Sequence, residues 1–158
     1  GRARGLLMQA ATLQLRHYHF NAFSLQASEQ LHDASHLDTG EIYPPLAVED
    51  LQPQISHAEP DTDDPHEFVV NLKLEHTPRA DSVFPYSFLI EAEGLFAIDH
   101  DGALDERRRL VAINGASILY GAMREHLLTL SARHRHGPVL LPCLDFRGLA
   151  PRGAGVDP

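Results

Sequence analysis

The sequence predicts an α+β domain, in which strands come first and helices follow. Stretches in the first two thirds of the chain alternate apolar and polar residues with period two, as strands with one buried face do. From Leu104 onward the apolar spacing becomes helical. With 158 residues, 43% of them hydrophobic, the chain has the size and composition of one globular domain. We expect its core over about residues 12–149, with short flexible ends.

The first predicted strand covers residues 12–26, "TLQLRHYHFNAFSLQ". Its alternation changes phase near Arg16 to Tyr18 and again near Ala22. An extra residue in one strand moves the side chains that follow to the other face. We therefore expect a long strand with bulges.

Two further strands, at residues 67–76 and 84–92, form a predicted antiparallel hairpin. The linker "TPRADS" between them carries the proline and aspartate of a tight connection. Residues 28–65, rich in proline and acids, predict a loop with one short strand near residues 51–57. The apolar positions of the hairpin are Phe68, Val70, Leu72, Leu74, Phe84, Tyr86, Phe88, Ile90 and Ala92.

The last third of the chain predicts two helices. The first runs through "ERRRLVAI" at 106–113, with Asp101 or Asp105 as its cap. The second begins after "NGAS", with Ser117 as its cap, and ends at Gly137-Pro138. An apolar closing segment, "VLLPCLDFRGLAP", follows that helix.

The second predicted helix has an apolar stripe of the width that packing on a sheet requires. The stripe consists of Leu119, Tyr120, Met123, Leu127 and Leu130. Ile118 and Leu128 fall outside it, so a second side of the helix is expected to meet a subunit or a bound polypeptide. Arg124 and Glu125 are expected on a solvated or ion-paired face.

Histidines and acids invite a metal or catalytic hypothesis that their spacing does not support. His32 and His36 are four residues apart, but the glutamate of a zinc-enzyme motif is missing between them. Asp99, Asp101 and Asp105 lack the glycine and glutamate spacing of an EF-hand. No nucleophile motif and no Gly-rich phosphate loop occurs. We expect no enzyme activity, no metal and no cofactor; a metal-dependent or small-ligand enzyme that uses the histidines is the rival hypothesis.

Charge and cysteine content narrow the partners. The balance of 13 basic against 22 acidic residues gives a net charge of −9, which argues against nucleic acid or an anionic membrane as the main partner. We find no targeting segment and no apolar run near the roughly 20 residues of a membrane span. The single Cys143 excludes an intramolecular disulfide, and its apolar neighbours predict that it is buried. His134 and His136 are expected to cap a helix end.

The stretch "ASILYGAMREHLLTLSARHRHGPVLLPCLDF" resembles the C-terminal half of the bacterial export chaperone SecB. The matching positions are Ile118, Leu119, Arg124, Glu125, Arg133, Leu141 and Phe146. "LQLRHYHFNAFSLQAS", "LQPQI", "FVVNLKLE" and "GLFAI" resemble earlier elements of that family in the same order, so the resemblance covers about residues 12–149.

The resemblance implies a four-stranded antiparallel sheet packed against a long helix, in a cytoplasmic homotetramer built as a dimer of dimers. It also implies an ATP-independent holdase that binds unfolded or precursor polypeptides in apolar grooves, as in protein export. By position in the family, the groove residues are Leu51, Ile55, Phe96, Tyr120, Leu141, Leu144, Phe146 and Leu149.

Departures from the family pattern affect the expected partners. The acids with which that family docks the translocase motor SecA fall on Ala22, Gln26 and Leu89. Client holding is therefore better supported than delivery to SecA. An alternative is a SecB-like chaperone that serves one partner, such as the antitoxin of a toxin–antitoxin system.

Overall fold

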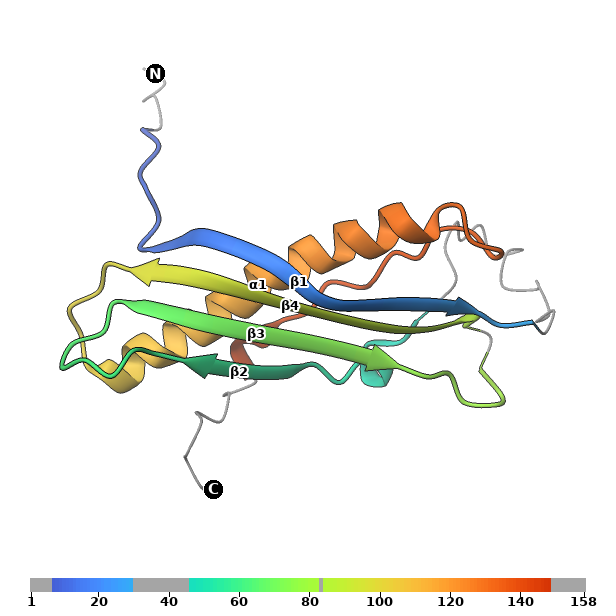
Figure 1. Cartoon of the computed structure of the whole chain (residues 1–158), viewed down its shortest axis with the longest axis horizontal. Helices are drawn as coiled ribbons and strands as arrows, with labels where there is room; N and C mark the ends of the chain where they lie inside the picture. The colour runs from blue at the N-terminus through green and yellow to red at the C-terminus, as the bar shows by residue number, and fades with distance from the viewer. Residues whose placement is uncertain (1–6, 30–45, 83, 149–158) are drawn as a thin grey trace, which may run out of the picture.

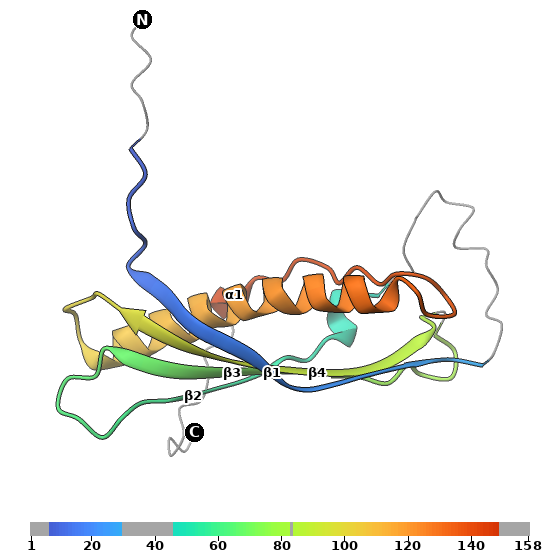
Figure 2. The same ribbon diagram turned by 45° about the horizontal axis from the view of Figure 1, so that its top comes forward.

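The computed structural model describes residues 7–29, 46–82 and 84–148. A four-stranded antiparallel sheet in the order β1-β4-β3-β2 is crossed on one face by a long helix (Figures 1 and 2). The predicted α+β class is confirmed. The elements are β1 (Leu13–Ala27), the short 3-10 helix η2 (Val48–Asp50), β2 (Gln54–Ala58), β3 (Glu67–His76), β4 (Tyr86–Ile98), α1 (Leu104–Ser131) and the short 3-10 helix η3 (Phe146–Gly148).

β1 is a long, twice-bulged edge strand, as its phase changes predicted. Its pairing with β4 shifts register between Leu15 and His17 and again between Phe20 and Ala22. Each shift places one extra residue in β1, so its apolar side chains return to the face that α1 covers. Phe20 and Phe23 both contact the ring of His126 on α1, although they are an odd number of residues apart.

β3 and β4 form the predicted antiparallel hairpin at the centre of the sheet. In β4, every second residue from Tyr86 to Ile98 is buried, and the residues between are half-buried. This alternation places one row under the helix and the other on the face that has no helix among the described residues (Figure 2). The short strand expected near residues 51–57 lies at Gln54–Ala58 and pairs with β3.

α1 is one continuous helix of 28 residues, so the prediction of two helices is wrong. Gly115 in "NGAS" does not break the helix but brings it close to the sheet. A Cβ atom there would lie 3.1 Å from Cγ2 of Val70 and 3.2 Å from Cε2 of Phe96. Packing therefore overrides the weak helix propensity of glycine. The residue at the N-cap is Ala103, without a side-chain hydrogen bond, so none of the caps proposed at Asp101, Asp105 and Ser117 is correct.

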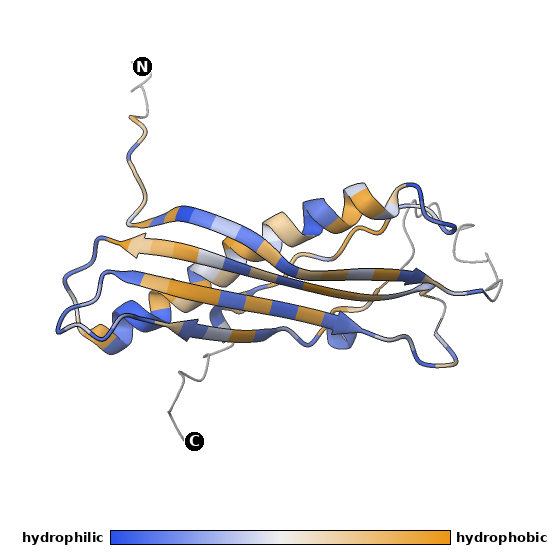
Figure 3. Cartoon of the chain, in the orientation of Figure 1, coloured by the Kyte–Doolittle hydropathy of each residue, from blue (hydrophilic) through white to orange (hydrophobic). Residues whose placement is uncertain are grey.

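The core lies between the sheet and α1. Hydrophobic and hydrophilic residues alternate along the strands and are interspersed along the helix (Figure 3). Leu119, Tyr120, Met123 and Leu127 of the predicted stripe are buried. Leu130 is 39% exposed, which corrects its assignment to the stripe. Arg107, 3% exposed, ties the loops at one end of the core together through hydrogen bonds to Asp64 and to the carbonyls of Pro65, His100 and Gly102.

Candidate functional site

The candidate site lies where the chain returns along α1 after the helix ends at Ser131, six residues before the predicted end at Gly137-Pro138. His134 Nδ1 lies 2.8 Å from the Leu130 carbonyl oxygen, in agreement with its predicted capping role. Gly137 adopts a φ of 82°, which side-chain-bearing residues rarely adopt, and the chain turns back there. Residues 139–146 of the predicted closing segment, to which the term refers from here on, then run beside α1 on the same side of the sheet (Figures 1 and 2).

Residues 139–145 of the closing segment run as an extended trace without a strand partner in the described part of the chain, and Phe146 begins η3 (Figure 2). Val139, Leu141 and Phe146 are at most 1% exposed, whereas Leu140 is 38% exposed. Alternating orientation of an extended chain explains this pattern up to residue 141. Cys143 is exposed, so the prediction of a buried cysteine is wrong, because the apolar character of its neighbours does not decide which side it faces.

Side chains of α1 hold the backbone of the closing segment. Ser131 Oγ accepts a hydrogen bond of 2.8 Å from the Val139 N–H. Arg124 Nε donates one of 2.9 Å to the Leu141 carbonyl. The Tyr120 hydroxyl donates to the Pro142 carbonyl. Glu125 is exposed, as predicted for this pair, whereas Arg124 is half-buried and also binds the backbone of the closing segment, which the prediction did not include.

Tyr120 is an enclosed anchor that also packs on the closing segment. It is 4% exposed, and its ring packs edge-on against Phe146, with centroids 5.6 Å apart. Burial raises the pKa of the Tyr120 hydroxyl, so this group stays a hydrogen-bond donor throughout the physiological range. At the end of the segment, Asp145 pairs with Arg147, whose hydrogen bonds lower the pKa of the Asp145 carboxyl to about 2. The Asp145 carboxylate is therefore charged there.

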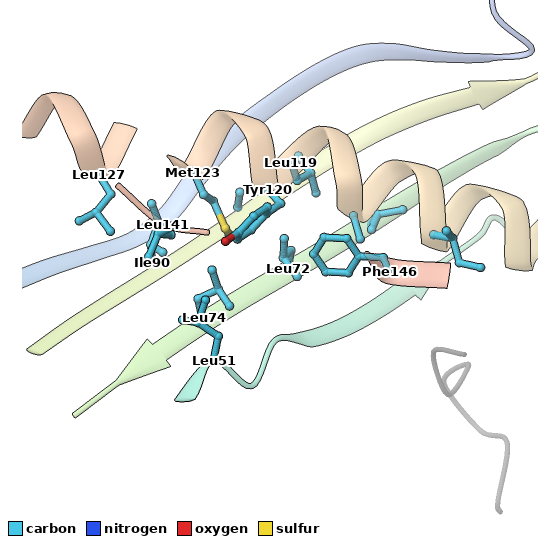
Figure 4. Close-up of a cluster of buried hydrophobic side chains, with 14 of the residues drawn as sticks. Leu51, Leu72, Leu74, Ile90, Leu119, Tyr120, Met123, Leu127, Leu141 and Phe146 are labelled. Atoms are coloured by element: carbon cyan, nitrogen blue, oxygen red, sulfur yellow. The ribbon is translucent and has the colours of Figure 1, made fainter. Parts of the chain in front are cut away.

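The structure brings most of the predicted groove residues together as core. Leu51, Tyr120, Leu141 and Phe146 lie in one cluster with α1 and β3 (Figure 4). Phe96 is buried under α1, and Ile55 and Leu144 are half-buried at the margin of the core. Leu149 lies outside the described residues. Leu141, Leu144 and Phe146 belong to the closing segment itself, and the client-binding role of the predicted groove residues stays a prediction.

Apolar surface remains outside this core. Tyr18 on β1 is 41% exposed, and Ile118 and Leu130 on α1 are 40% and 39% exposed. Phe20 and Phe23 are half-buried, and His126 of α1 stacks on Phe20 with ring centroids 4.1 Å apart. We call Tyr18, Phe20 and Phe23 the aromatic row of β1. Because β1 is an edge strand, its outer backbone N–H and C=O groups pair with no strand of the described sheet, and the aromatic row lies beside them.

The opposite face of the sheet is mixed in character. Ala22 and Gln26 lie opposite Glu91 and Ser87 of β4, and Leu89 lies opposite Ser24. These positions, at which the SecB family carries acids, share the face away from α1. Acids remain nearby, since Glu93 contacts His19 at 3.4 Å and accepts a hydrogen bond from Asn21.

A pocket of about 340 Å³ lies at one end of the sheet. Its lining comes from the end of β1 and from the β3–β4 connection, with Arg79 and Glu29 among the polar residues. None of the described groove residues lines it. It is therefore separate from the closing segment.

Metal-ligand clusters and membrane-spanning helices were sought in the part of the chain that the structure describes. No group of three or more His, Cys, Asp or Glu residues could hold a metal ion within residues 7–29, 46–82 and 84–148. His32 and His36 lie outside these ranges. No described helix combines the length and apolar character that a membrane span needs.

Comparison with known proteins finds similarity at the level of structure. No family model matches the sequence, and no curated protein matches it either. A solved SecB-like chaperone of Mycobacterium tuberculosis, in complex with a ChAD peptide from an antitoxin, superimposes with a TM-score of 0.49 at 18% identity. The chain is similar to a SecB-like chaperone. The superposition covers 84% of this chain and 91% of that one. A protein of unknown function from Streptococcus agalactiae is also similar, with a TM-score of 0.46 and 13% identity over 85% of this chain and 99% of that one.

Proposed function

We propose that this chain is an ATP-independent holdase, a binding protein rather than an enzyme, that takes up unfolded or precursor polypeptides on apolar surface and keeps them from aggregating. The sequence resemblance to SecB supports this function. The excess of apolar surface over what one core requires supports it independently.

The observation that carries the proposal is that α1 leaves apolar side chains uncovered. Most of its apolar residues pack in the core, while Ile118 and Leu130 are 40% and 39% exposed. The half-covered aromatic row of β1 adds to this surface. Burial of apolar area is non-directional, so such a surface accepts many client sequences without recognising a particular one.

Assembly into a homotetramer is part of the proposal. The free edge of β1 and the outer side of α1 are different surfaces of one chain, and two distinct self-complementary contacts generate a dimer of dimers. We place this assembly in the cytoplasm, where unfolded precursors are available. Sedimentation velocity on the purified chain measures the assembly state directly.

The second candidate is a chaperone dedicated to one partner, such as an antitoxin. The neutral residues Ala22, Gln26 and Leu89 favour it, because they remove charge where the SecB family docks SecA. Affinity for SecA and protection of several unrelated clients separate the two candidates. A general export holdase binds SecA and protects many clients, whereas a dedicated chaperone protects only its own partner.

The test of the holdase function is dilution of a chemically unfolded protein with and without this chain, in the absence of ATP. Light scattering should fall as the chain reaches the concentration of its client. Leu130→Asn removes exposed apolar area and should weaken protection. Thr129→Asn, at the neighbouring exposed position, is the matched control and should leave protection unchanged.

One result would end the proposal, and another would exclude α1 as the binding surface. The general holdase function is wrong if equimolar wild-type protein leaves scattering unaltered for every client tried. The apolar surface of α1 is not the binding surface if Leu130→Asn and Thr129→Asn protect equally well while sedimentation shows the same assembly for both.

A further inference from the structure

The closing segment is bound to α1 in the way that a foreign extended peptide would be bound. Its backbone hydrogen bonds go to three side chains of the helix, Tyr120, Arg124 and Ser131, and to no strand of the described sheet. These side chains are four and seven residues apart along α1, a spacing that keeps them on one side of a helix. The helix therefore presents a ladder of hydrogen-bonding side chains to an extended chain.

We propose that residues 139–146 occupy a client groove as an internal stand-in, and that an extended apolar stretch of a client displaces them. This inference rests on the proposed holdase function and adds where a client binds and what competes with it. It also reassigns Leu141, Leu144 and Phe146 from the wall of the groove to its occupant.

Backbone recognition explains how one groove accepts different clients. Tyr120 and Arg124 donate to carbonyl oxygens, and Ser131 accepts from an N–H, so each contact is to a group that nearly every residue carries. Side-chain identity matters only where Val139, Leu141 and Phe146 enter the core. Exposed Leu140 and Cys143 impose no such requirement.

The closing segment indicates which kind of client stretch fits the groove. The groove takes an extended stretch with apolar side chains at a first and a third position and a large one at an eighth, as in "VLLPCLDF". The first six residues of the stretch carry no charge. The seventh residue, Asp145, pairs with Arg147, which follows the stretch. A helical client does not fit, because alternate burial of neighbouring residues requires an extended backbone.

A client can bind only those molecules in which the tethered segment has left the groove. The apparent affinity for the client therefore equals the intrinsic affinity multiplied by the fraction of such molecules. Weakening the segment without touching the helix should therefore strengthen client binding. Val139→Ala removes buried methyl groups from the segment and should tighten client binding about tenfold. Leu140→Ala is the matched control, since that side chain is exposed and its loss should leave client affinity unchanged.

The single cysteine provides a direct readout in the full-length chain. Cys143 is the only cysteine and is exposed within the closing segment, so a nitroxide label reports the motion of the segment alone. The probe is a fluorescent synthetic peptide with the sequence of residues 138–146 and serine in place of cysteine. Anisotropy measures its binding, and the spectrum of the nitroxide measures release of the segment in the same mixture.

Saturable peptide binding with a matching rise in nitroxide mobility is the expected result, with Val139→Ala binding more tightly than wild type and Leu140→Ala. Peptide binding that leaves the nitroxide immobile, or that Val139→Ala does not strengthen, would overturn displacement while leaving the holdase function intact. If neither wild type nor Val139→Ala bound the peptide or suppressed aggregation, both proposals would be wrong. Binding by Val139→Ala alone would support the stand-in role.

Discussion

Replacing Gly115 and Gly121 of α1 by alanine, one at a time, should have opposite effects on the free energy of unfolding. Both glycines lie inside the same helix, so each substitution gains about 1 kcal/mol of helix propensity. The two sites differ in what the new methyl group meets. Around Gly121 no heavy atom lies within 4 Å of the added Cβ, and the residue is exposed.

At Gly115 the added Cβ would lie 3.1 Å from Cγ2 of Val70 and 3.2 Å from Cε2 of Phe96. Both neighbours are completely buried, so neither can move aside without disturbing the core. Overpacking of this kind costs about 1–3 kcal/mol. With a cost near 2 kcal/mol, Gly115→Ala should destabilise the protein by about 1 kcal/mol, whereas Gly121→Ala should stabilise it by about 1 kcal/mol.

Urea unfolding followed by circular dichroism measures both changes. The expected gap of about 2 kcal/mol between the variants corresponds to roughly 4–8 °C in melting temperature for a chain of this size. Sedimentation velocity should show the same assembly for each variant, so that the comparison concerns folding alone. A stabilising Gly115→Ala would refute the close approach of α1 to the sheet.

Three further predictions concern buried polar groups. Burial lowers the pKa of His57 in the folded chain below 6.5. The unfolded chain therefore binds a proton at His57 more readily than the folded chain does. The free energy of unfolding should fall as the pH drops through 6.5 toward the folded-state pKa. Denaturant unfolding at pH 7.5 and 5.5 should show a smaller loss in His57→Leu than in wild type. Ser131→Ala should destabilise by about 1–3 kcal/mol because the buried Val139 N–H loses its acceptor, and Ser131→Thr, which restores a hydroxyl, should recover part of this loss by the same assay. Arg107→Met should cost about 1–3 kcal/mol because the buried Pro65 carbonyl loses its donor, and equal losses in Arg107→Met and the more exposed Arg108→Met would contradict the role given to Arg107.

The strands were predictable because their signal is local. The alternation over residues 67–76 reproduces β3, and the phase changes near Arg16 and Ala22 locate both bulges of β1. The continuity of α1 was not predictable, since "NGAS" reads as a helix break until β3 and β4 are placed beneath it. Glycine there is favoured by a non-local contact that no helical periodicity records.

The candidate site was predictable only in part. Tyr120 and Arg124 are four residues apart, a spacing that places them on one side of a helix, and this was visible in the sequence. Their partners, the carbonyls of Pro142 and Leu141, lie beyond a turn whose length periodicity does not determine. Ser131 was missed for the same reason. An apolar stretch with a proline after a long helix was the available signal that the chain returns along that helix.

The two bulges of β1 bear on how its long open edge meets other strands. A regular strand of 15 residues would offer an uninterrupted template on which further strands could add and grow into fibrils. The register shifts at Leu15/His17 and Phe20/Ala22 interrupt this template and increase the local twist. A strand without matching irregularities can pair with β1 over only one run at a time, which disfavours amyloid-like extension from this edge.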